Sequence, residues 1–125
     1  MKYSDTTASD CRYGSVAASI FGDADIIWED SVSGWQGEAE VLAHMPDGTF
    51  AHYGWTYGSC SGCDDWEYRG LSDGEIEAEM RREMVTFHSV ETVLRYAQAL
   101  KDTSMADALL NWLNDKIAKA KEAAQ

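Results

Sequence analysis

The sequence predicts a single α+β domain, in which a three-stranded antiparallel β-meander is followed by C-terminal helices packed on one face of the sheet. Two observations support this fold class. Apolar and polar residues alternate with period two within residues 35–45 and 49–58, and apolar residues recur at helical spacing after residue 72. The chain has 125 residues, of which 45% are hydrophobic, and this is enough for one core and one domain.

The N-terminal part of the chain is predicted from its composition. Residues 1–14 are rich in Ser, Thr, Asp and Gly and predict a loose lead-in. Residues 15–22 allow one or two helical turns that end at Gly22. Residues 24–32 are rich in β-branched and aromatic side chains and predict the first strand.

The second and third strands show the clearest alternation. In residues 35–45, apolar side chains such as Val41 alternate with polar ones, so one face is apolar and the other is largely polar. The Pro-Asp-Gly sequence at 46–48 predicts a turn. Residues 49–58 continue the alternation and place Trp55 on the face that is expected to be buried.

After residue 71 the apolar period becomes that of a helix. Ser72 lies three residues before Glu75, which is the spacing of a capping box. Ser104 is expected to cap the last helix, in which Leu109 belongs to the apolar stripe. Helices are therefore predicted near residues 73–87, 89–101 and 104–122.

Charge restricts the kind of partner. The net charge is −12, and residues 1–70 hold 12 acids against three bases. The absence of a basic patch in the sequence disfavours direct binding of nucleic acid or an anionic membrane, whereas a basic surface of another protein would be attracted. The residues expected to contact such a partner are Glu29, Asp30, Glu38, Glu40, Asp64, Asp65, Trp66 and Glu67.

Several features predict a cytoplasmic protein. No apolar run approaches the roughly 20 residues that cross a bilayer, and the N-terminus lacks the apolar region of a signal peptide. Three cysteines, an odd number, fit poorly with a disulfide framework, which favours a reducing compartment.

The stretch Y-G-S-C-S-G-C-D-D-W-E, residues 57–67, is the one that could carry chemistry. Its two cysteines, Cys60 and Cys63, have the spacing of a zinc-binding pair, but a closed site needs two more ligands. Cys11 and one of His44, His52 or His88 are the candidates. Redox exchange is a weaker interpretation, because the three acids that follow disfavour a thiolate. We favour a tight turn with no bound cofactor, and zinc bound by Cys60, Cys63 and Cys11 is the alternative.

The same stretch follows an acidic, alternating strand and Pro-Asp-Gly. It resembles small uncharacterised proteins encoded by phages, several of which carry a Y-G-S-C-S-G-C-D signature after a strand. The resemblance covers residues 35–70. It implies a phage or prophage origin, and an anti-defence role in the host cell, such as an anti-CRISPR function, is the context that this origin suggests.

The sequence predicts a binding protein rather than an enzyme. It contains no Gly-rich phosphate loop, nucleophile elbow or H-E-x-x-H motif. His44 and His52 are expected on the polar faces of adjacent strands, where we interpret them as surface residues. Two alternatives stay open, namely a zinc-binding domain built on the CSGC turn, and a phage structural component that forms homo-oligomers through its C-terminal helices.

Overall fold

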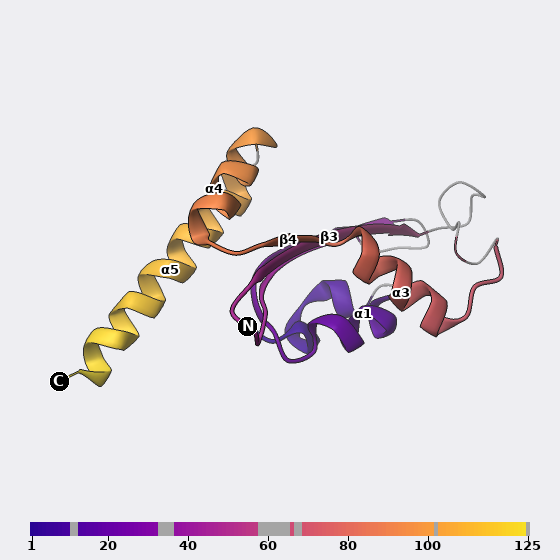
Figure 1. Cartoon of the computed structure of the whole chain (residues 1–125), viewed down its shortest axis with the longest axis horizontal. Coiled ribbons are helices and arrows are strands. Elements are labelled where there is room, and N and C mark those ends of the chain that lie inside the picture. Colours follow the sequence, from indigo (N-terminus) through magenta and orange to yellow (C-terminus); the bar gives the residue numbers. More distant parts are fainter. Residues whose placement is uncertain (11–12, 33–36, 58–65, 67–68, 102, 125) are drawn as a thin grey trace.

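The computed structural model describes residues 1–10, 13–32, 37–57, 66, 69–101 and 103–124. The architecture is α+β, with an antiparallel sheet in the strand order β1-β2-β3-β4 and helices in its N- and C-terminal parts (Figure 1). The strands are β1 (Asp25–Val32), β2 (Gly37–His44), β3 (Phe50–Tyr57) and β4 (Val85–Phe87). None of the described helices is long and apolar enough to cross a membrane.

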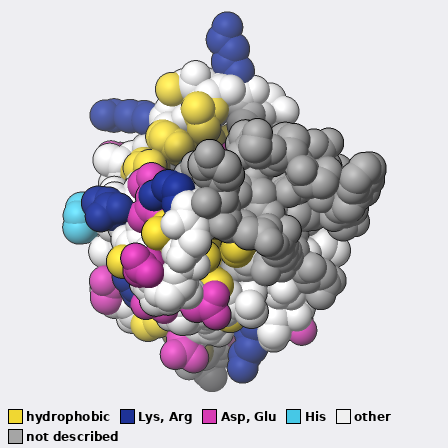
Figure 2. All heavy atoms as spheres, turned by 90° about the vertical axis from the view of Figure 1, so that its right-hand side faces the viewer, with side chains coloured by type: hydrophobic (Ala, Val, Ile, Leu, Met, Phe, Trp, Pro, Cys, Tyr) yellow, Lys and Arg dark blue, Asp and Glu magenta, His cyan; other side chains and the backbone are white. Residues whose placement is uncertain are grey.

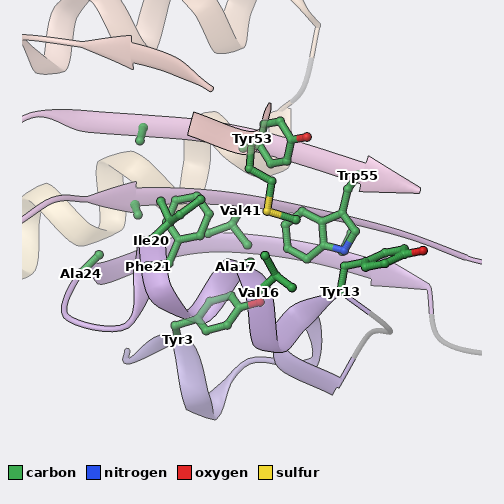
Figure 3. Close-up of a cluster of buried hydrophobic side chains, with 14 of the residues drawn as sticks. Tyr3, Tyr13, Val16, Ala17, Ile20, Phe21, Ala24, Val41, Tyr53 and Trp55 are labelled. Carbon is green, nitrogen blue, oxygen red and sulfur yellow. The ribbon is translucent and has the colours of Figure 1, made fainter. Parts of the chain in front are cut away.

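One face of the sheet carries the larger core. The helical elements on this face are η1 (Tyr3–Asp5), η2 (Thr7–Asp10), α1 (Gly14–Phe21) and α3 (Asp73–Glu83). The alternating apolar residues of β2, among them Val41, are buried here as predicted. Figure 3 shows Tyr53 and Trp55 on the sheet side of this cluster and Tyr3 on the helical side.

The loose lead-in predicted at 1–14 is wrong for the described residues, because Tyr3–Asp5 and Thr7–Asp10 form η1 and η2. Tyr3 is buried, and its hydroxyl donates a hydrogen bond of 2.9 Å to the carbonyl oxygen of Gly14. The Tyr3 ring also lies 6.0 Å from the ring of Phe21. A large aromatic side chain in a polar segment therefore anchors that segment to the core.

The opposite face of the sheet carries a second core beneath α4 (Val90–Ala99) and α5 (Thr103–Ala123). These helices form a hairpin at one end of the sheet, and α5 extends beyond it (Figure 1). The prediction of helices on one face only is therefore wrong. The physical reason is that Leu42 and Phe50, which lie on the strand faces predicted to be polar, are buried and bring the hairpin onto the sheet.

Two indole groups connect this hairpin to β1. The Nε1 atom of Trp28 donates to Ser104 Oγ over 2.7 Å, and the Nε1 atom of Trp112 donates to Asp25 Oδ2 over 2.7 Å. Lys116 Nζ lies 3.3 Å from the same Asp25 oxygen. Ser104, predicted as a cap, thus lies within the first turn of α5 and accepts a hydrogen bond from the sheet.

The fourth strand was not predicted. The Ser72–Glu75 capping box is confirmed, but α3 ends at Glu83 instead of residue 87. Val85–Phe87 instead pairs with β3, because β-branched and aromatic residues suit an available sheet edge. The predicted burial of Trp55 and Leu109 is confirmed, with exposed fractions of 4% and 0%.

Candidate functional site

The candidate site lies along the part of β3 that β4 does not reach. The pairing of these two strands runs from Phe50 opposite Phe87 to His52 opposite Val85. Among the described residues, no further strand pairs with this edge from Tyr53 to Tyr57. A hollow of about 650 Å³ lies beside it, and we call it the edge hollow. It is lined mainly by residues of β2, β3 and α3, including Glu38, Glu40, Gly54, Trp55, Glu79 and Glu83.

The strand register places two carboxylates on one wall of the edge hollow. Glu38 lies opposite Thr56, and Glu40 lies opposite Gly54, so all four share the sheet face that α4 and α5 partly cover. A Cβ atom at position 54 would lie 2.9 Å from the Cγ atom of Glu40. Glycine at this position therefore leaves room for the Glu40 side chain to lie across β3.

Helix α3 supplies the opposite wall. Glu83 Oε2 accepts a hydrogen bond of 3.3 Å from the Tyr53 hydroxyl. Burial and the nearby charge of Glu83 raise the pKa of Tyr53, so this phenol stays neutral and remains a donor. Arg69 donates to both carboxylate oxygens of Glu79, over 2.9 and 3.1 Å. Four carboxylates thus line the hollow, and Arg69 is the one cation among the described residues that do so.

Two tryptophans also line the edge hollow. Trp66 is half-buried, and its ring packs edge-on against Tyr13 at a centroid distance of 4.8 Å. Trp55 is buried, yet its indole Nε1 has no hydrogen-bond acceptor among the described residues. A buried donor without an acceptor is unfavourable, so a ligand atom that accepts from it would be stabilised.

The structure brings together some of the residues expected from the sequence. Glu38, Glu40 and Trp66 line the edge hollow. Asp30 is exposed and pairs with Glu40 across β1 and β2, so it extends the acidic wall. Glu29 faces the other side of the sheet, where its carboxylate accepts a hydrogen bond of 3.0 Å from Thr7. Asp64, Asp65 and Glu67 lie outside the described residues.

Sequence reasoning missed two of the four carboxylates of the site. Glu79 and Glu83 lie within the helix predicted at 73–87, but neither was among the residues expected to contact a partner. Their spacing of four residues places them on one side of α3, and that spacing was the available signal. Figure 2 shows acidic side chains among basic and hydrophobic ones on the described part of the side that lies at the right of Figure 1.

His52 is not the surface residue that the sequence predicted. It is buried beneath α4, with Nδ1 2.9 Å from the Tyr96 hydroxyl oxygen and Nε2 3.7 Å from Glu40 Oε1. His44 lies opposite Phe50 rather than opposite His52, and its ring packs against Phe50 and Trp112. The two histidines share a face of the sheet but are not direct cross-strand partners.

The described residues contain no group of three His, Cys, Asp or Glu side chains that could hold a metal ion. Cys11, Cys60 and Cys63 lie outside those residues, so zinc binding stays a prediction.

Comparison with known protein families, curated proteins and solved structures finds no match. The chemistry that the described residues bring together at this edge is therefore that of four carboxylates around the edge hollow.

Proposed function

We propose that this chain is a non-enzymatic binding protein whose edge hollow receives a basic surface of another protein. The observation that supports the proposal best is the grouping of four carboxylates from β2 and α3 around one hollow. The one lining cation that the structure describes, Arg69, is already engaged by Glu79. A partner that brings Lys or Arg side chains would compensate this uneven charge.

The net charge of the whole chain also favours a basic partner. A net charge of −12 attracts a basic partner over long range and speeds its association. Salt screens such forces over a Debye length of about 10 Å at 0.1 M ionic strength. Binding is therefore expected to weaken as salt is added.

The resemblance of residues 35–70 to phage-encoded proteins suggests the biological setting. In that setting the partner is a host protein with a basic surface, such as the nucleic-acid-binding site of a defence effector. Occupying that surface would block it, with the protein acting in the host cytoplasm.

Capture from a bacterial host lysate tests the proposal. Wild-type protein is compared with a Glu38→Gln/Glu40→Gln variant and with an Asp107→Asn/Glu122→Gln control, which removes the same charge from exposed positions on α5. We expect wild type and control to retain a basic protein that the first variant loses. The purified partner should then bind in a salt-dependent manner. Equal capture by all three proteins contradicts the proposal.

Self-association is a second candidate, favoured by one observation on α5. Leu110 and Ile117 are 43% and 46% exposed and lie seven residues apart, on the same side of a helix that extends beyond the sheet (Figure 1). A stripe of this kind could join two copies in a phage structural or assembly component. Light scattering of wild type and of a Leu110→Lys/Ile117→Lys variant tests it, because a dimer should become a monomer.

A further inference from the structure

We propose that the edge hollow binds an extended basic segment as an added strand, which pairs with Tyr53–Tyr57, the part of the β3 edge that no other described strand pairs with. The added segment would lie beside β3 on the same edge as β4, at the residues that β4 does not reach. This inference rests on the proposed function and specifies how the partner is held and which chemistry it must present. The partner chemistry is that of a peptide with Arg or Lys at alternate positions.

The backbone of β3 provides the first argument. β4 pairs only with Phe50, Ala51 and His52, and the chain before β4 turns away into α3 at Met84. In an antiparallel sheet, alternate residues of an edge strand direct their N–H and C=O groups outward. The five residues from Tyr53 to Tyr57, at roughly 3.3 Å each, span about 16 Å. This length suits an added strand of four or five residues.

The side chains around this edge explain why the segment should be basic. Successive side chains of an added strand point to opposite faces of the sheet. One set would meet Glu38 and Glu40, so Arg or Lys at alternate positions suits this face. The other set would lie on the α3 side beside Tyr53 and Trp55. No cation among the described residues lies within ion-pair distance of Glu38. Arginine suits these positions best, because its guanidinium can bind a carboxylate with two hydrogen bonds.

Two residues of β3 itself fit close approach of another backbone. Gly54 is exposed at the centre of this edge, and because it lacks a side chain the Glu40 side chain lies across β3 toward the position of the added strand. Trp55 lines the hollow with a buried indole N–H that lacks an acceptor among the described residues. A bound segment that places an acceptor, such as a hydroxyl oxygen, on the α3 side of the sheet would satisfy this donor.

A short synthetic peptide tests strand addition directly. The probe is a fluorescein-labelled peptide of sequence Thr-Arg-Val-Arg-Val-Arg-Thr, and fluorescence polarisation measures its dissociation constant. Two isomers carry N-methyl groups on alternate backbone amides, one isomer on each set. Because only one edge of the peptide can pair with β3, we expect one isomer to bind at least about tenfold more weakly and the other to bind nearly unchanged.

The other outcomes separate this inference from the proposed function. If both N-methylated isomers bind as tightly as the parent peptide, strand addition is overturned. The proposed function still stands in that case if Glu38→Gln/Glu40→Gln weakens binding and Asp107→Asn/Glu122→Gln does not. Absence of binding by the parent peptide also overturns strand addition. As an independent readout, the bound parent peptide should slow amide hydrogen exchange within Tyr53–Tyr57.

Discussion

Asp25, the first residue of β1, connects three parts of the chain and gives a quantitative prediction. Its carboxylate oxygens lie 2.9 Å from the Met1 amine, 2.7 Å from Trp112 Nε1 and 3.3 Å from Lys116 Nζ. Burial alone would raise the pKa of Asp25, but hydrogen bonds from these three groups lower it from 3.8 to about 2. Asp25→Asn keeps the shape of the side chain and removes the charge, so it should destabilise the fold.

The size of the effect follows from the pKa. A fall from 3.8 to about 2 corresponds to roughly 2.5 kcal/mol between the charged and neutral forms. The Asp25 side chain is 32% exposed, and solvent screening reduces the expected loss to about 1 kcal/mol. Since the folded pKa lies below the unfolded one, the stabilisation is fully present above about pH 4. It is lost as the pH falls from about 4 towards 2.

Urea unfolding followed by tryptophan fluorescence measures this difference. We expect the gap between wild type and Asp25→Asn to be about 1 kcal/mol near pH 7 and to fall by more than half near pH 2.5. Asp23→Asn is the control, because Asp23 is exposed and lies two residues away. Equal stability of wild type and Asp25→Asn near pH 7, or a gap that does not change with pH, would refute the reasoning.

Three further predictions concern the two cores and the cysteine turn. Leu109→Ala should lower the free energy of unfolding by about 3 kcal/mol, because Leu109 is fully buried in the second core. Leu110→Ala, at a position 43% exposed, should change it by less than about 0.5 kcal/mol. Equal losses for the two variants in urea melts would contradict the second core. Val41→Asp places a charge at a fully buried position and should lower the thermal midpoint sharply, so an unchanged midpoint means that the first core is misassigned. Cys60→Ser and Cys63→Ser should each lower stability by about 1–2 kcal/mol and leave metal content at zero, whereas stoichiometric zinc or a melt that collapses in EDTA would establish the metal alternative.

The elements that the sequence predicts correctly depend on local patterns. The strands predicted at 24–32, 35–45 and 49–58 differ by at most two residues at each end from β1, β2 and β3. Alternation within each strand and the Ser72–Glu75 box are readable without knowledge of distant contacts. The strand β4 was missed because three residues are too few to show a period, and its pairing with β3 is a long-range contact.

The second core and the complete site depend on contacts between distant segments. Leu42 and Phe50 are isolated apolar residues among polar ones, and their burial becomes evident only when α4 and α5 return to the sheet. Alternation identified Glu38 and Glu40 as neighbours on one face. It could not show that Glu79 and Glu83, about 40 residues later, form the facing wall.

Binding through the edge hollow is tested most directly by measuring how tightly the unmodified Thr-Arg-Val-Arg-Val-Arg-Thr peptide binds to wild type and to two variants. The dissociation constants of the three proteins are compared. The three proteins are wild type, Glu38→Gln/Glu40→Gln and Asp107→Asn/Glu122→Gln, each first shown to be folded by its circular-dichroism melt. We predict that the first variant binds at least about tenfold more weakly than wild type, and that the second stays within about twofold, because only the first changes the wall of the hollow. Equal weakening of both variants would mean that net charge alone attracts the peptide, and it would contradict a binding site at the edge of β3.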